Sequence, residues 1–305
     1  MDEYTKPIES RYIRLFQMIK NLLHIIRWPN ILILAGIQSL VYFRLLYLEQ
    51  SHLGLFSFVA LSLITISLAA GGYVINDFYD RDIDRINKPH RLIAGKGWSL
   101  SRVKMLYTLL TVLGAILSVL LARRLGLFSY IFVYPLAVLG LWYYSYALKC
   151  KPIIGNLWVS FFCAFVVGIV ALPDMILKNT HPIKDELWYY MVFAFLSTWY
   201  REAVKDIEDK EGDERSNCRT AVVRYGIKAG KIMAVLLGLL LLASLLLWDS
   251  MQTNSRIKLC LNIIQVFTVA SMAFVWWAKN NTYYHQASNV IKLVMVIGTA
   301  LLLFI

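Results

Sequence analysis

Long apolar runs, each close to the length of a membrane-spanning helix, recur along the whole chain. A helix of about 20 apolar residues crosses the roughly 30 Å hydrocarbon core of a bilayer. Most connections between the runs are short, so consecutive helices should be antiparallel. We therefore predict an all-α polytopic membrane protein with nine transmembrane helices. The predicted spans cover approximately residues 29–48, 53–75, 104–122, 125–147, 153–176, 185–204, 229–248, 258–278 and 286–305.

The N-terminal segment has a different pattern from the spans. Apolar positions recur near helical spacing over residues 12–26, and basic residues lie between them. This pattern is typical of an amphipathic helix at a membrane surface, although a plain basic tail is the alternative. The first 20 residues lack a continuous apolar stretch, so we predict no cleavable signal peptide. We divide the chain into an interfacial segment, residues 1–28, and one membrane domain, residues 29–305.

The composition supports a membrane protein, and the charge distribution orients it. Of the 305 residues 59% are hydrophobic and 16% are charged, whereas soluble domains have about 25% charged residues. If the N-terminus is cytoplasmic, 23 Lys and Arg residues fall in cytoplasmic segments and six in the opposite loops. This asymmetry is the positive-inside rule, so the net charge of +12 does not require a nucleic-acid partner. We predict a multi-pass plasma-membrane protein with its N-terminus in the cytoplasm.

The cysteines show no pattern of paired use. Cys150, Cys163, Cys218 and Cys260 form no C-x-x-C pair, and three of them fall within or close to the predicted spans. We therefore predict four unpaired thiols, with neither a disulfide framework nor a zinc site.

The second span ends in the acidic stretch N-D-F-Y-D-R-D-I-D, which begins at Asn76. If the helix continues through this stretch, Asn76, Asp80 and Asp84 lie at i, i+4 and i+8 and share one face, while Asp77 and Asp82 point elsewhere. An amide oxygen and two carboxylates form a ligand set for a hard cation such as Mg²⁺. The alternative is a solvated, charge-rich helix end.

A second acidic stretch, K-D-I-E-D-K-E-G-D, follows the sixth span. Asp206, Asp209 and Asp213 lie at i, i+3 and i+7, again on one helical face. Both stretches end even-numbered spans, so both face the same side of the membrane, which we predict to be cytoplasmic. Two acidic sets at one depth repel each other unless a cation lies between them. The pair therefore favours a metal site over a solvated helix end.

Basic and aromatic residues follow the same spans. Lys88 and Arg91 come soon after the first acidic stretch, and Lys149 follows the aromatic segment that contains Tyr144 and Tyr146. Carboxylates, a divalent metal and Lys or Arg side chains together suit a polyanion such as a diphosphate. Aromatic rings turned inward could stabilise a developing carbocation, although Tyr is also common at membrane interfaces.

These motifs resemble those of the UbiA superfamily of intramembrane prenyltransferases. The first stretch is similar to the family's N-D-x-x-D-x-x-x-D signature, and the second is similar to its D-x-x-D-x-x-x-D signature. Y-S-Y-A-L-K (144–149) with G-N (155–156) resembles the family's tyrosine-rich element, and R-W-P-N (27–30) resembles the start of its first helix. The resemblance covers essentially the whole chain.

The resemblance implies nine helices around a central cavity and Mg²⁺-dependent ionisation of a prenyl diphosphate, whose allylic carbon the acceptor attacks. It implies metal ligation by Asn76, Asp80, Asp84, Asp206, Asp209 and Asp213. It assigns catalytic roles to Lys149, Arg91 and Tyr146, and substrate binding to Arg27, Asn30, Lys88, Tyr144, Lys205 and Asn156. The expected partners are the prenyl diphosphate, the acceptor and membrane lipids, with no nucleic acid and no obligate protein partner.

The sequence motifs identify the acceptor substrate less clearly than the prenyl diphosphate donor. I-N-K-P (86–89) is similar to an element that chlorophyll synthases, homogentisate prenyltransferases and family members that prenylate geranylgeranylglycerol phosphate share, and of these we expect the glycerol phosphate acceptor class. An aromatic quinone precursor such as 4-hydroxybenzoate is the alternative. R-L-I-A-G-K (91–96) and R-T-A-V (219–222) depart from the family pattern, so they do not support assignment to one branch. A polytopic transporter is the rival of another class, but transporters place ionisable groups near the bilayer midplane. Here they lie at span ends.

Overall fold

The computed structural model describes residues 5–47, 51–87, 93–177 and 185–305. Within these ranges the chain is helical, apart from turns, loops and one isolated bridge between Ala94 and Trp98. The described part therefore confirms the all-α prediction.

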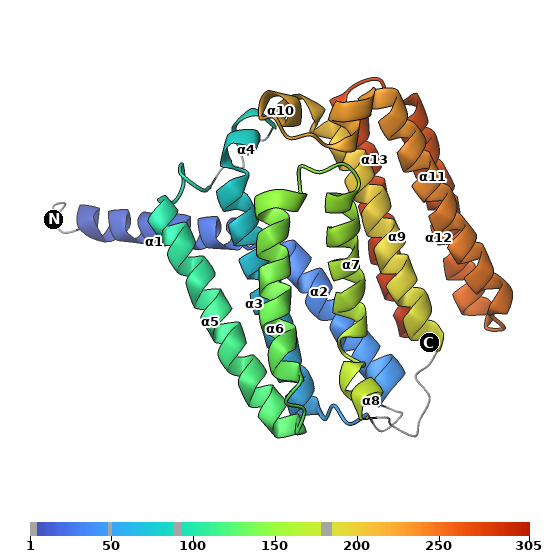
Figure 1. Cartoon of the computed structure of the whole chain (residues 1–305), viewed down its shortest axis with the longest axis horizontal. Helices are drawn as coiled ribbons and strands as arrows, with labels where there is room; N and C mark the ends of the chain where they lie inside the picture. Colours follow the sequence, from blue (N-terminus) through green and yellow to red (C-terminus); the bar gives the residue numbers. More distant parts are fainter. Residues whose placement is uncertain (1–4, 48–50, 88–92, 178–184) are drawn as a thin grey trace.

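The helices form a bundle with most axes roughly parallel or antiparallel (Figure 1). Their bounds are α1 Thr5–Ile25, α2 Trp28–Val41, α3 Leu55–Tyr79, α4 Arg81–Asn87, α5 Leu100–Leu125, α6 Tyr130–Tyr143, α7 Ile154–Gly168, α8 Leu172–Ile176, α9 Asp185–Glu208, α10 Lys210–Arg215, α11 Ala221–Met251, α12 Ser255–Trp277 and α13 Asn281–Ala300. Single π-helical turns, Tyr42–Leu46 and Tyr144–Leu148, extend α2 and α6, and a 3₁₀ turn, Leu301–Phe304, follows α13.

Seven helices in the described ranges are long and apolar enough to cross a membrane: α2 and α6 with their π turns, α13 with its 3₁₀ turn, and α3, α5, α11 and α12. Each of the nine predicted apolar runs coincides with a helix or a pair of helices. The count of nine spans is not confirmed, because α7 has only 15 residues and α9 has acidic residues in its first turn and a basic residue in its last turn.

Apolar side chains occupy both the interior and the outer surface of the bundle. The core includes Tyr200, Leu241 and Leu261, all fully buried, and α9 packs against α7, α11 and α13. Many outward-facing side chains are also apolar, and Leu236 and Val266 are 55% and 67% exposed. Such a surface would promote aggregation in water, but it suits contact with lipid tails.

The two acidic stretches each break a helix at their central aspartate. α3 ends at Tyr79 and α4 begins at Arg81, so Asp80 lies at the junction. α9 ends at Glu208 and α10 begins at Lys210, with Asp209 at the junction. The helix is therefore interrupted at Asp80, although the backbone N–H of Asp84 still donates to the carbonyl of Asp80 at 2.8 Å. The two short helices α4 and α10 lie together at one end of the bundle (Figure 1).

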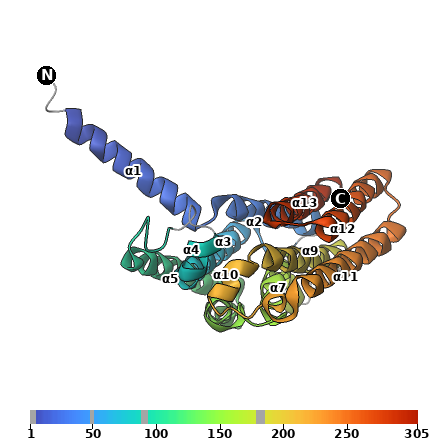
Figure 2. The same cartoon turned by 90° about the horizontal axis from the view of Figure 1, so that it is seen from above.

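The predicted N-terminal amphipathic helix is present as α1. It projects away from the bundle when seen from above (Figure 2). Its apolar residues Ile13, Phe16 and Ile19 are 67%, 70% and 48% exposed, so the bundle does not cover this face. Location of α1 at the membrane surface stays a prediction.

One cysteine prediction is wrong. Cys150 and Cys218 form a disulfide with an S–S distance of 2.04 Å, whereas Cys163 and Cys260 are free. The bridge joins the segment that follows the π turn of α6 to the segment that follows α10. The two cysteines are 68 residues apart in sequence, so only the tertiary structure brings them together.

We expect Cys150→Ser to lower the thermal stability of the protein. In the loop-entropy model, a disulfide that closes a segment of this length raises the free energy of unfolding by at most about 4 kcal/mol. The gain is smaller here, because membrane helices stay ordered before they pack. The measurement is the temperature of half-inactivation of the oxidised protein in lipid. Cys260→Ser is the matched control, because its thiol is free. Equal inactivation temperatures for both variants and the unaltered protein would contradict a stabilising bridge.

Candidate active site

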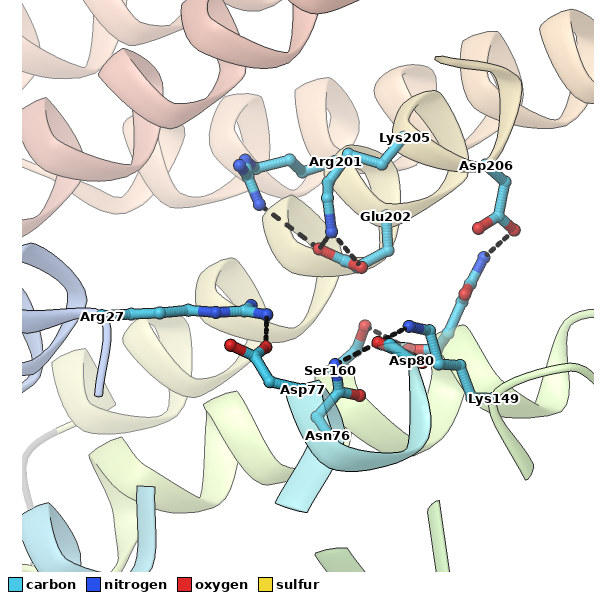
Figure 3. Close-up of polar contacts among 11 residues, drawn as sticks. Arg27, Asn76, Asp77, Asp80, Lys149, Ser160, Arg201, Glu202, Lys205 and Asp206 are labelled. Carbon is cyan, nitrogen blue, oxygen red and sulfur yellow. Dashed lines mark hydrogen bonds and ion pairs between the residues drawn. The ribbon is translucent and has the colours of Figure 1, made fainter. Parts of the chain in front are cut away.

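Asp80 lies at the centre of a group of polar side chains below α4. Its side chain accepts hydrogen bonds from the ammonium group of Lys149 and from the side-chain amide of Asn76, and the residue is only 4% exposed. Lys149 directly follows the π turn of α6, so this contact joins α3 to α6 (Figure 3). Burial alone would lower the pKa of the Lys149 ammonium, but the adjacent Asp80 carboxylate raises it, with a contribution from Asp84. Lys149 is therefore a fixed positive charge.

The second acidic stretch contributes the opposite side of the site. One side-chain oxygen of Asp206 accepts a hydrogen bond of 2.9 Å from the side-chain amide of Asn156 in α7. On the preceding turn of α9, the Glu202 carboxylate pairs with Lys205 at 2.9 Å and with Arg201 at 3.3 Å. Glu202 lies four residues before Asp206 and therefore extends the same helical face.

Two neighbouring tyrosines have different environments. Tyr144 lies within electrostatic range of Lys149, Glu202, Asp80 and Asp206, so it belongs to the site. Tyr146 is 61% exposed and packs with other exposed rings: it stacks on Trp142 with ring centroids 5.3 Å apart, and its edge meets Tyr79. The catalytic role of Tyr146 therefore stays a prediction, because its largely exposed ring packs on Trp142 and Tyr79.

A third polar group lies where α1 meets α2. Arg27, at the junction, adopts the left-handed conformation with φ 52°. Its guanidinium pairs with Asp77 at 2.9 Å and lies 4.9 Å from the ring centroid of Tyr73. Asp77 thus points away from the face of Asp80, as the helical spacing predicted. Asn30, the third residue of α2, accepts a hydrogen bond of 3.4 Å from Lys292 of α13.

Asn87 joins the two acidic stretches directly, although sequence reasoning gave it no role. Its side-chain amide donates to the carbonyl of Asp209 at 3.0 Å, and its side-chain oxygen accepts from the backbone N–H of Gly212 at 3.0 Å. A β-carbon at position 212 would overlap the Asn87 amide. This overlap explains why a glycine stands at the middle position of E-G-D. We call the two hydrogen bonds of the Asn87 side chain the Asn87 clasp. In the sequence, only the position of Asn87 within I-N-K-P indicated that this residue could be important. The local pattern does not show which residues it contacts.

We expect Asn87→Ala to raise the KM for the prenyl diphosphate about 10-fold, because two hydrogen bonds that hold α10 against α4 are lost. Gly212→Ala should raise the same KM by at least as much, because the added β-carbon displaces the Asn87 side-chain amide. The double variant Asn87→Ala/Gly212→Ala should be no worse than Asn87→Ala alone, since the overlap then disappears.

Gly36→Ala is the matched control for the clasp, because Gly36 is a helical glycine with nothing near its missing β-carbon. Its KM should equal that of the unaltered protein. Additive losses in the double variant would show that the two residues act independently and that the clasp does not position the acidic stretches.

Two of the remaining predicted site residues, Lys88 and Arg91, lie outside the described residues. The others lie close to the Asn87 clasp. Asp213 is 5% exposed, and its carbonyl accepts a hydrogen bond from the backbone N–H of Cys218 at 2.8 Å. Asp209 and Asp213 lie on the α10 side of the Asn87 clasp, and Asp84 lies on the α4 side. The structure therefore brings the two acidic stretches together, as their shared membrane side predicted.

The donor set fits a hard cation that is shared with substrate oxygens. Among the described residues, no three His, Cys, Asp or Glu side chains converge closely enough to hold a metal by themselves. Mg²⁺ commonly binds through one or two carboxylates and completes its octahedron with water and phosphate oxygens. Asp80, at the end of α3, and Asp206, in α9, can supply such carboxylates. A diphosphate between them would provide the missing oxygens.

Comparison with known proteins gives concordant results for family and fold. Residues 37–297 match the UbiA prenyltransferase family. A digeranylgeranylglyceryl phosphate synthase of Saccharolobus solfataricus is 35% identical over 231 residues, which are 74% of this chain and 76% of the relative. A protein of the same name from Methanosphaera stadtmanae is 29% identical over 251 residues, 79% of this chain and 85% of the relative.

Two solved structures share the fold over nearly the whole chain. A structure of a digeranylgeranylglyceryl phosphate synthase superposes with a TM-score of 0.65 at 22% identity, covering 94% of this chain and 97% of the other. A UbiA homologue from Archaeoglobus fulgidus bound to GPP and Mg²⁺ gives a TM-score of 0.60 at 15% identity, with 92% and 99% coverage.

Proposed function

The chain belongs to the UbiA prenyltransferase family, and on that premise we propose that it transfers an isoprenoid chain from a prenyl diphosphate to geranylgeranylglyceryl phosphate. One observation carries the proposal. Asp80, Lys149, Asn156 and Asp206, from α3, α6, α7 and α9, converge at one end of a membrane bundle. The names of the Saccharolobus and Methanosphaera relatives support the glycerol phosphate acceptor.

We propose that the two acidic stretches bind Mg²⁺ together with the diphosphate. The ligands on one side would be Asn76, Asp80 and Asp84, and those on the other side Asp206, Asp209 and Asp213. When bound, the metal would neutralise charge that develops on the leaving diphosphate. The Mg²⁺ in the Archaeoglobus homologue supports this assignment.

The chain's own residues then serve the transfer. The bond between C1 of the isoprenoid and the diphosphate oxygen breaks, the acceptor hydroxyl oxygen bonds to C1, and the hydroxyl proton passes to the departing diphosphate. Lys149 is placed to stabilise the departing diphosphate. The Tyr144 ring lies near this group and would stabilise the allylic cation. The apolar bundle excludes water, which would otherwise capture the cation.

Other residues complete the proposal. Lys205 and Asn156 keep their proposed substrate-binding roles. Lys205 pairs with Glu202 and Asn156 donates to Asp206, so both lie at the second acidic side of the site. Lys88 and Arg91 are proposed as further diphosphate ligands on the basis of the sequence alone. Arg27 and Asn30 are proposed to bind the acceptor. Tyr146 is left out, since its largely exposed ring packs on Trp142 and Tyr79.

We also propose an orientation. The site and the N-terminus would face the cytoplasm of a plasma-membrane protein, because the basic residues predominate in the segments at that end. The helix α1 would lie on the membrane surface with its apolar face in the lipid.

The decisive experiment is a transfer assay with the full chain in lipid, Mg²⁺ and labelled geranylgeranyl diphosphate. Geranylgeranylglyceryl phosphate and 4-hydroxybenzoate are offered as acceptors in separate reactions. We expect label in the glycerol phosphate product only. Label only in the aromatic product would move the protein to quinone-precursor prenylation, and transfer to neither acceptor would overturn the proposed acceptor class.

A further inference from the structure

The disulfide bridge lies between the two halves of the candidate site. Cys150 directly follows Lys149, whose ammonium group contacts Asp80 of the first acidic stretch. Cys218 follows α10, and its backbone N–H donates to the carbonyl of Asp213 at 2.8 Å. The segments that carry the two cysteines lie at the end of the bundle with α4 and α10 (Figure 1). The bridge therefore joins the segment of Lys149 covalently to the end of the second acidic stretch.

The covalent ring that the bridge closes contains the second half of the site. Residues 150–218 include Asn156 and the three aspartates of the second acidic stretch. The Asn156 amide donates to Asp206 at 2.9 Å, so α7 and α9 meet inside this ring. The start of α7 also packs closely on the segment before the bridge, because a β-carbon at Gly155 would lie 2.9 Å from the carbonyl oxygen of Lys149. A shift of this segment would thus disturb both the Lys149 ammonium and the Asn156 amide.

The turn between the bridge and α7 is strained. Ile153, the residue before α7, has φ 65° and ψ −46°, which is an outlier for a β-branched residue. Such a conformation persists only where the surrounding structure holds it. The bridge at Cys150 holds one end of this turn, and α7 holds the other. We expect the turn to relax when the bridge opens, and the backbone of Lys149 to move with it.

The location of the bridge is unusual for the orientation that we propose. Disulfides are rare on the cytoplasmic side of a membrane, where thiols are kept reduced, except in hyperthermophiles and in proteins whose bridges open and close for catalysis or redox sensing. Cys218 is only 1% exposed, whereas Cys150 is partly exposed. A reductant therefore reaches the bridge from the side of Cys150.

We propose that the Cys150–Cys218 bridge positions Lys149 and the second acidic stretch for binding of the metal and the diphosphate, and that reduction of the bridge weakens this binding. The proposal rests on the proposed function and deepens it with a form of redox control. One thiolate of a dithiol reductant attacks the sulfur of Cys150, and the sulfur of Cys218 leaves. The second thiol of the reductant then releases Cys150. Two electrons and two protons pass to the cysteines, and the dithiol becomes a disulfide.

The test compares the full chain in lipid before and after treatment with dithiothreitol, below the inactivation temperature of the reduced form. Free thiols are counted in both samples, and we expect two before reduction and four after it. Reduction should raise the Kd and the KM for geranylgeranyl diphosphate, and the Mg²⁺ concentration for half-maximal binding, about 10- to 100-fold, as loss of groups that orient metal ligands does. The KM for the acceptor should not change, because its proposed ligands, Arg27 and Asn30, lie at the start of α2. Reoxidation should restore the original values.

Two variants separate the bridge from other effects of the reductant. Cys150→Ser/Cys218→Ser should have the Kd and KM of the reduced protein and should not respond to dithiothreitol. Cys260→Ser is the matched control, because its thiol is free. It should bind the diphosphate as the unaltered protein does, both before and after reduction.

Three results would overturn the proposal. Unchanged binding of the diphosphate and Mg²⁺ after reduction would show that the bridge serves thermal stability alone. An equal rise in the KM for donor and acceptor, or a loss that reoxidation does not restore, would show a general loosening of the fold. Two free thiols after treatment would show that a dithiol does not reach the bridge. Because binding of the donor needs no acceptor, these results are distinct from a failure of the proposed glycerol phosphate transfer.

Discussion

Asp80→Ala is expected to lower the rate of prenyl transfer at least about 1,000-fold while the protein still inserts into the membrane. Asp80 is buried, and its side chain accepts from both Lys149 and Asn76. The substitution removes a carboxylate from the proposed metal site, where such a ligand supports several kcal/mol of charge stabilisation. It also leaves the Lys149 ammonium without its nearest counter-charge. The measurement is kcat with saturating prenyl diphosphate and acceptor, over a range of Mg²⁺ concentrations.

The same acidic stretch provides a matched control. Asp82 is two residues away, but its side chain is 65% exposed and pairs with Arg81 and Arg85 at 3.3 Å. The hydrogen bond from Arg81 lowers the pKa of Asp82, so this carboxylate is charged at neutral pH. Asp82→Ala should keep the rate within about twofold, because exposed pairs contribute little. Turnover by Asp80→Ala equal to that of Asp82→Ala would remove Asp80 from the mechanism.

Lys149→Met is expected to give the second largest loss, about 100- to 1,000-fold in kcat. A positioned charge that stabilises a leaving group acts mainly in the transition state, so kcat should fall more than the KM for the diphosphate rises. The Asp80–Lys149 contact links α3 to α6 in the bundle, and methionine retains the length and apolar stem of the side chain. Single-turnover transfer measures the chemical step directly.

Lys151→Met is the control for this prediction. Lys151 follows Lys149 by two residues and is exposed, as expected of a basic residue that contributes only to the orientation of the helices in the membrane. Its substitution should leave kcat unchanged. A rise in KM with constant kcat in Lys149→Met would show that Lys149 binds the diphosphate equally in the ground state and the transition state, and would contradict its role in leaving-group stabilisation.

Local patterns along the chain determined the helices and the composition of the site. Apolar runs of span length predicted the helices because lipid leaves backbone groups no partner except those within the helix. The spacing of Asn76 and Asp80 put them on one face, and they do make contact. The same spacing correctly set Asp77 apart. Residues three or four apart are neighbours on any helix, so such relations can be read without a tertiary structure.

Tertiary packing decided the relations between distant segments. The Cys150–Cys218 bridge, the Asn87 clasp and the contact of Lys292 with Asn30 join residues 68, 122 to 125 and 262 positions apart. No local period encodes such distances, because they depend on how complete helices pack. The sequence by itself therefore determined which groups lie at each helix end, and only the packing of the helices decided which of them meet.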